Sequence, residues 1–200
     1  MSSLSDNPLA SLVRYIANDC EIRIFVETGT AHGTSAFFAS QVFDHVVTID
    51  KIQEFQDEAR RRQADWQSKG LKLDNIEYVL GDTREVLEPI LKSLRGERSL
   101  YWLDAHAFPG GYNSASYECP LMTELELINQ YDPYGHSWVL IDDVHDLNPP
   151  MDPDTYPPLR QVIQTGVNGT GRICLVAHDV VVLAPEGHAM ALRRFRDAVN

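Results

Sequence analysis

Five short apolar runs in this chain each end at an acidic residue. They are IRIFVE (22–27), HVVTID (45–50), IEYVLGD (76–82), SLYWLD (99–104) and SWVLIDD (137–143). Short runs rich in β-branched and aromatic residues are typical of strands in a parallel sheet that is covered on both faces. Because a ligand of such a sheet binds beyond the carboxyl ends of its strands, these acids are candidate functional residues.

The turn after the first run combines an acid with two glycines. Glu27, Gly29 and Gly33 form the pattern ExGxxxG, and a helix-like stretch begins near Gly33. The glycines allow the backbone to pass close to a ligand, but a dinucleotide site favours GxGxxG with the pyrophosphate at the helix N-terminus. A carboxylate in this loop would repel a pyrophosphate and attract an ammonium or sulfonium group. We therefore expect S-adenosylmethionine, which carries both cations, in preference to NAD.

Two further acids continue this set on the following strands. Asp50 closes the second run, where a carboxylate can accept hydrogen bonds from ribose hydroxyls. Asp82, in the sequence GDT, closes the third run, where it or its neighbours can meet the adenine edge. The alternative is that these acids serve only as helix caps and turn residues.

A second group of acids follows the fourth and fifth runs. Asp104 lies in WLDAH, and Asp142 and Asp143 lie in IDDVH. Three carboxylates that converge at one edge repel each other unless a cation, a proton or a hydrogen-bond donor intervenes. Hard oxygen ligands of this kind favour Mg²⁺, with Mn²⁺ or Ca²⁺ as alternatives. The Asp-Asp pair could instead be a strand end capped by backbone amides.

The spacing of the runs predicts the fold that positions these acids. Helix-length segments separate the runs, at 33–43, 52–69, 83–95 and 117–130, and strands that alternate with helices indicate right-handed βαβ units. RICLVAH and DVVVLAP follow each other too closely for a crossover helix, so they must pair antiparallel through a turn near His178 and Asp179. We predict a Rossmann-like α/β fold with a doubly wound seven-stranded sheet: five parallel strands plus a C-terminal antiparallel hairpin.

The remaining segments fit a single domain over residues 1–200. Residues 1–20 contain an amphipathic helix, expected at 6–19 from apolar residues at helical spacing. Two loop-like stretches, AFPGGYNSAS (107–116) and DLNPPMDPDTYPP (146–158), are expected on the substrate side.

Composition restricts the class of partner. The net charge is −12, and a negative field of this size would repel nucleic acid. No apolar run is long enough to span a bilayer, the N-terminus lacks the pattern of a secretory signal, and Cys20, Cys119 and Cys174 are scattered like reduced thiols. We expect a cytoplasmic protein that acts on a small molecule, without nucleic acid or membrane as a partner; the sequence leaves the oligomeric state open.

Three motifs resemble those of class I S-adenosylmethionine-dependent methyltransferases. They are VETGTAHGTS, VVTID and VLGDT, and the resemblance covers roughly residues 20–185. It implies that Glu27 and the turn from Gly29 to Gly33 hold the methionine part of the cofactor and that Asp50 holds the ribose.

The second group of acids is similar to the Mg²⁺ site of metal-dependent O-methyltransferases that act on macrolide sugars. The resemblance implies that Asp104, Asp142 and Asp143 bind a metal, which holds two vicinal acceptor hydroxyls and lowers the pKa of one. His106 and His145 are then the candidate bases, with an aspartate as a third, although either histidine could be only a hydrogen-bonded loop residue. WLDAHAFPGGYNSASYECP continues differently from the macrolide enzymes, so the acceptor is not implied.

The sequence therefore predicts a metal-assisted O-methyltransferase that acts on a hydroxyl of a small molecule, either sugar-like or a natural product. One alternative is an iron-dependent oxygenase on a similar fold, in which Asp104, His106 and His145 form a two-histidine, one-carboxylate set. Another is a non-catalytic module that keeps the cofactor pocket. A metal requirement without oxygen consumption distinguishes the methyltransferase from the oxygenase.

Overall fold

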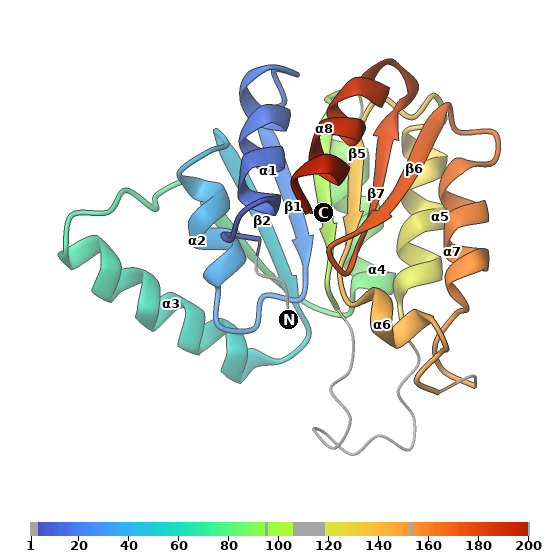
Figure 1. Cartoon of the computed structure of the whole chain (residues 1–200). Coiled ribbons are helices and arrows are strands. Elements are labelled where there is room, and N and C mark those ends of the chain that lie inside the picture. The colour runs from blue at the N-terminus through green and yellow to red at the C-terminus, as the bar shows by residue number, and fades with distance from the viewer. Residues whose placement is uncertain (1–3, 95, 106–118, 153, 200) are drawn as a thin grey trace.

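A seven-stranded sheet forms the centre of the protein (Figure 1). The computed structural model describes residues 4–94, 96–105, 119–152 and 154–199. The strand order is β3-β2-β1-β4-β5-β7-β6. The parallel strands are β1 (Ile24–Thr28), β2 (His45–Asp50), β3 (Ile76–Leu80), β4 (Ser99–Leu103) and β5 (Trp138–Ile141). The hairpin of β6 (Arg172–Ala177) and β7 (Val180–Pro185) adds antiparallel to β5, which confirms the predicted Rossmann-like topology.

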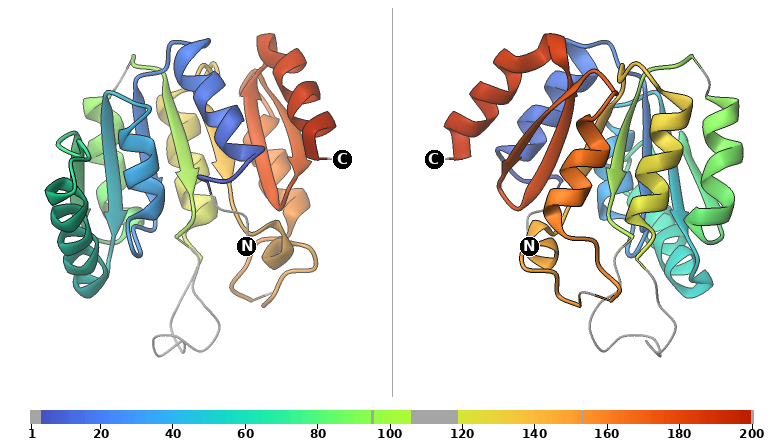
Figure 2. Two further views of the ribbon diagram at one scale, coloured as in Figure 1. Left: turned by 60° about the vertical axis from the view of Figure 1, so that its left-hand side comes forward. Right: turned by 90° about the vertical axis from the view of Figure 1, so that its right-hand side faces the viewer.

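Helices cover both faces of this sheet (Figure 2). One face packs against α1 (Leu9–Asn18), α2 (Thr34–Ser40) and α8 (Ala189–Val199). The other packs against α4 (Thr83–Ser93), α5 (Leu121–Tyr131) and α7 (Leu159–Val167). α3 (Gln53–Ser68) lies along β2 and β3. Within the described ranges, no helix has the length and apolar character needed to cross a membrane.

The apolar runs are continuous because successive strand residues supply two separate cores. In β1, Phe25 packs into the core under α1 and α8, whereas Val26 packs into the core under α4 and α5. All five residues of β4 are buried for the same reason. This two-sided burial is the physical origin of the pattern from which the parallel sheet was predicted.

Several boundaries differ from the predicted ones. β1 continues to Thr28, so Glu27 lies inside the strand and not at its end. A short helix, α6 (Val144–Leu147), overlaps the start of the predicted loop at 146–158, and α7 begins directly after that loop. The described residues between α6 and α7 contain no further helix. The other predicted loop, at 107–116, lies outside the described residues.

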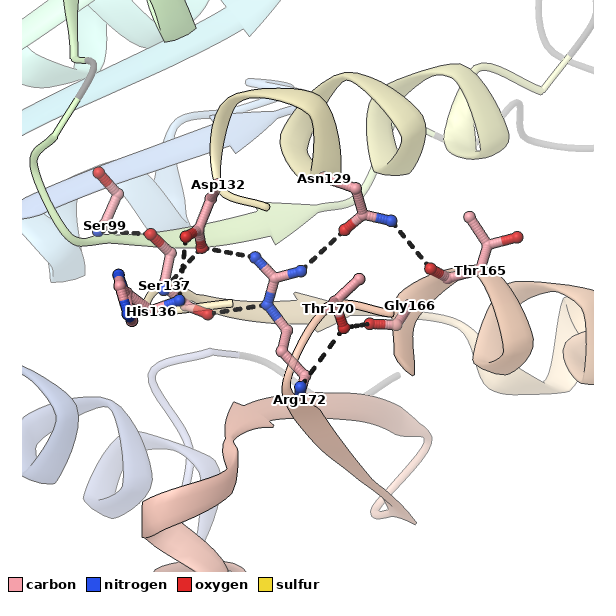
Figure 3. A network of polar contacts seen from close by, with 9 residues as sticks. All are labelled: Ser99, Asn129, Asp132, His136, Ser137, Thr165, Gly166, Thr170 and Arg172. Carbon is pink, nitrogen blue, oxygen red and sulfur yellow. Dashed lines mark hydrogen bonds and ion pairs between the residues drawn. The ribbon is translucent and has the colours of Figure 1, made fainter. Parts of the chain in front are cut away.

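A buried ion pair holds the amino-terminal edge of the sheet together (Figure 3). The side chain of Arg172, at the start of β6, is 0% exposed, and its Nη2 donates to Asp132 Oδ2 at 2.6 Å. Its Nη1 donates to Asn129 Oδ1 at 2.8 Å and its Nε to the carbonyl of Ser137 at 3.1 Å. Asp132 in turn accepts from the backbone N–H of Ser137 at 2.8 Å. One guanidinium thus joins β6 to the end of α5 and to the segment entering β5.

Removing this guanidinium should destabilise the fold strongly. Arg172→Ala would leave the Asp132 carboxylate without its cation, and breaking a buried pair in this way costs about 3–5 kcal/mol. Urea denaturation followed by circular dichroism measures the change in the free energy of unfolding. The matched control is Arg196→Ala, which removes an exposed pair with Asp197 and should cost about 0–1 kcal/mol. Equal effects of the two substitutions would contradict the role given to Arg172.

Candidate functional site

The strand order reverses between β1 and β4, because the chain passes from β1 to β2 and β3 and then returns to β4 and β5. Ligands of open α/β sheets bind beyond the carboxyl ends of the strands at this switch point. The loop after β1 packs tightly there: a Cβ on Gly29, whose φ is +91°, would lie 2.4 Å from the carbonyl oxygen of Asp104. Gly33 has a φ of +75° and precedes α2 as its N-cap. Both predicted glycines are therefore required by the backbone of this loop itself.

Glu27 is a fully buried carboxyl group below the loop. Its Oε1 accepts a hydrogen bond from Thr48 Oγ1 at 2.7 Å, and the hydroxyl of Thr48 also lies 2.6 Å from that of Thr30 in the loop. Its Oε2 has no hydrogen-bond partner in the part of the chain that the structure describes. Burial raises the pKa of Glu27 to about 8, with a further contribution from the charge of Asp50. The site thus contains a buried carboxyl group with one oxygen still unsatisfied.

Asp50 lies beside Glu27 as the last residue of β2. Its Oδ2 accepts from the backbone N–H of Ala31 at 3.1 Å, and its Oδ1 accepts from that of Ile52 at 2.9 Å. Burial raises the pKa of this carboxyl group, and the backbone hydrogen bonds partly offset the increase. Each oxygen keeps acceptor capacity after one bond, so the carboxylate is held in one orientation and can still accept from a ligand.

The predicted metal-binding acids lie along the same edge. Asp104 directly follows β4, and Asp142 and Asp143 directly follow β5. Burial, then the charges of Asp142 and Asp143 and finally that of Glu27, raise the pKa of Asp104 well above its ordinary value. The structure therefore brings the acids from β1, β4 and β5 close enough to repel one another.

His145 is held at this edge by a residue that the sequence reasoning missed. Its Nδ1 lies 2.7 Å from Asp179 Oδ2, and its backbone N–H donates to Asp179 Oδ1 at 2.9 Å. The hydrogen bond to Asp179 raises the pKa of His145. Asp179 belongs to the β6–β7 turn, which reaches the carboxyl edge because β7 runs antiparallel to β5. The sequence predicted this turn, and that was the available signal for Asp179, but it did not place the turn next to the strand that carries IDDVH.

The possible metal ligands meet in a combination different from the predicted one. Within the described ranges, one group of three ligand atoms lies within 4.8 Å of one another, from Asp143, His145 and Asp179. Among the described residues, neither Asp104 nor Asp142 contributes a ligand atom to this group. His106, the other candidate base and a member of the alternative oxygenase set, lies outside the described residues.

Asp82 lies apart from this group. It caps the N-terminus of α4, where its carboxylate accepts from the backbone N–H of Arg84 at 3.0 Å and from the Arg84 Nη2 at 2.7 Å. These bonds lower the pKa of Asp82. Its capping role agrees with the alternative weighed for this acid, and it remains a candidate for the adenine edge only as a proposal.

Solved structures match the fold of this chain, whereas the comparisons of its sequence found no match. No protein-family model and no curated protein sequence matches the chain. Among solved structures, the SAH-bound methyltransferase PaMTH1 of Podospora anserina is 19% identical, with a TM-score of 0.59 over 92% of this chain and 79% of its own.

Two other structures extend this likeness. The O-methyltransferase TomG of Streptomyces achromogenes, involved in tomaymycin synthesis and solved with SAM, is 17% identical, with a TM-score of 0.57 over 90% of this chain and 80% of its own. An rRNA methylase of Streptococcus thermophilus is 14% identical, with a TM-score of 0.54 over 88% of this chain and 92% of its own. The chain therefore has the fold of class I S-adenosylmethionine-dependent methyltransferases.

Glu27 should make the stability of the protein depend on pH. Its pKa of about 8 exceeds the ordinary value of 4.5, so the native state holds a proton that the unfolded chain has lost. The resulting stabilisation is complete below pH 4.5 and is lost as the pH rises to about 8. Glu27→Gln, which keeps an acceptor for Thr48, should flatten the decline in urea denaturation between these limits. An unchanged slope, equal to that of the exposed control Glu54→Gln, would contradict this.

Proposed function

We propose that the chain is an S-adenosylmethionine-dependent methyltransferase that methylates a hydroxyl group of a small molecule with the help of a divalent metal. The observation that carries the proposal is the gathering of Glu27, Asp50 and Asp104 around the β1–β4 switch point of a methyltransferase fold. The bound SAM and SAH of structurally similar proteins support the choice of cofactor.

The residues at the switch point suit the cofactor chemically. Glu27 offers a buried oxygen that has no hydrogen-bond partner among the described residues, and its carboxylate would be a negative partner for an ammonium or sulfonium cation. Asp50 is oriented by two backbone amides and has acceptor capacity left for two ribose hydroxyls. The same acids disfavour the pyrophosphate of NAD. When bound, the cofactor supplies an electrophilic methyl group on a positively charged sulfur.

The acids after β4 and β5 suit a hard divalent cation. Asp104, Asp142 and Asp143 carry carboxylate oxygens, and a cation would relieve the repulsion that Asp142 and Asp143 exert on Asp104. Carboxylate ligands favour Mg²⁺, with Mn²⁺ or Ca²⁺ as alternatives. Asp179, which lies in the same group as Asp143 and His145, could extend the ligand set. A metal bound there would lower the pKa of an acceptor hydroxyl and orient it.

The chain's own residues would then remove the proton. If the Nδ1–H of His145 donates to Asp179, the basic nitrogen is the Nε2, which lies 3.3 Å from Asp146 Oδ1 and can accept the proton of an acceptor hydroxyl. His106 is the second candidate base. Loss of this proton to the base would make the acceptor oxygen a nucleophile for the methyl group that the bound cofactor would supply, with the cofactor's sulfur as the leaving group.

The acceptor is proposed to be a small molecule, sugar-like or a natural product. The structurally similar proteins include both a natural-product enzyme and an rRNA methylase, so the fold alone does not choose between them. The net charge of −12 disfavours RNA, because nucleic-acid binding depends on cations that neutralise phosphates. Two vicinal hydroxyls suit the proposed metal, which favours sugar-like acceptors.

Calorimetric titration with S-adenosylhomocysteine tests the cofactor. We expect micromolar binding, which Asp50→Ala should weaken by about 1–3 kcal/mol through the loss of charge-assisted hydrogen bonds to the ribose. Asp57→Ala, an exposed acid on α3, is the matched control and should leave the affinity unchanged. Tight binding of NAD with no heat from S-adenosylhomocysteine would overturn the assignment.

Metal dependence is tested separately from cofactor binding. Asp143→Ala removes an oxygen ligand, so most of the methyl transfer should be lost while S-adenosylhomocysteine still binds. Activity should disappear after EDTA treatment and return with Mg²⁺ or Mn²⁺, without oxygen consumption. Full activity of the EDTA-treated protein on its acceptor would refute the metal, and metal-dependent oxygen uptake would favour the oxygenase alternative.

A further inference from the structure

A second buried carboxyl group lies at the switch point, on the opposite face of the sheet from Glu27. Glu124, in the first turn of α5, is 1% exposed. Its Oε2 accepts a hydrogen bond from Thr28 Oγ1 at 3.3 Å, and its Oε1 has no partner among the residues with described positions. Thr28 directly follows Glu27 in β1, and adjacent strand residues point to opposite faces. The end of β1 thus carries one buried carboxyl group, that of Glu27, and contacts a second, that of Glu124, through Thr28.

The same group also reaches the start of α4. The side chain of Thr83, the first residue of α4, lies near enough to Glu124 to lower the pKa of its carboxyl group, as the side chain of Thr28 also does. One carboxyl group therefore joins the end of β1, the start of α4 and the first turn of α5. β1 leads into the loop of Gly29 and Gly33, and α4 follows the strand end where the adenine is expected.

The pKa of Glu124 depends on burial, on two threonine side chains and on one neighbouring charge. Burial raises its pKa to about 7, the hydrogen bonds from Thr83 and Thr28 oppose this, and the charge of Asp82 adds to it. Asp82, which caps α4, is itself paired with Arg84. From β1 the facing group is the uncharged hydroxyl of Thr28. Glu124 is thus neutral in mildly acidic solution, and above neutrality it becomes a buried charge with one unsatisfied oxygen.

We propose that Glu124 is a positioning residue of the cofactor site. It holds the end of β1, which leads to the proposed methionine site, and the start of α4, on the proposed adenine side, at the spacing that the cofactor requires. This inference rests on the proposed function. A neutral carboxyl group can both donate to and accept from the two threonine hydroxyls, whereas the carboxylate only accepts. Ionisation therefore loosens the junction, and the affinity for the cofactor falls as the pH rises through neutrality.

The test is calorimetric titration with S-adenosylhomocysteine between pH 6 and pH 8.5 on full-length variants. Glu124→Ala should weaken binding about 10-fold at pH 6, because both threonines lose their common partner. Glu124→Gln keeps a neutral donor and acceptor, so it should bind within about 3-fold of the wild type at pH 6. Above pH 7 the wild-type affinity should decline more steeply than that of Glu124→Gln. Glu126→Ala, an exposed acid on the same helix, is the matched control.

The outcomes separate this inference from the proposed function. If the wild type binds S-adenosylhomocysteine and its affinity depends on pH in the same way as that of Glu124→Gln, the positioning role is refuted. The cofactor assignment then stays intact. Absence of wild-type binding at every pH would refute both. If Glu124→Ala does not fold, the comparison of the wild type with Glu124→Gln still decides, because that substitution preserves the shape of the side chain.

Discussion

Mutual repulsion among buried acids at one edge of the sheet is the constraint on which the candidate site depends. β1, β4 and β5 are parallel neighbours, so Glu27, Asp104 and Asp142 reach the same edge. There, burial and neighbouring charges raise the pKa values of Glu27 and Asp104. Acids held this closely in a partly desolvated environment remain ionised only when a cation compensates them, and this constraint is the link between the topology and the cationic cofactor and metal that we propose.

The rest of the fold keeps these acids in place. The close approach of Gly29 to the backbone of Asp104 fixes the loop after β1 against the end of β4. At the opposite edge, the buried guanidinium of Arg172 fixes β6 relative to α5 and β5 (Figure 3). Because β6 leads through the turn at Asp179 to β7, this buried ion pair also helps to set where Asp179 contacts His145.

The parallel sheet, the hairpin and the acids at the strand ends could be predicted because each follows from a local pattern. Asp179 and Glu124 could not be assigned roles in the same way. Asp179 contacts His145 of α6, which lies 34 residues earlier in the chain, and Glu124 contacts the hydroxyl of Thr28 in β1, so both depend on tertiary contacts. The sequence placed the end of β1 at Glu27, one residue too early, because burial continues through Thr28.

The most direct measurement is a crystal structure grown with S-adenosylhomocysteine and Mg²⁺. The ligand should lie at the β1–β4 switch point, with its ribose hydroxyls within hydrogen-bond distance of Asp50 and its methionine part beside the turn from Gly29 to Gly33. A groove of about 730 Å³ between α1 and α8, lined by Leu12 and Phe195 among others, offers a competing location. Ligand density in that groove, with none at the switch point, would contradict the assignment of the site.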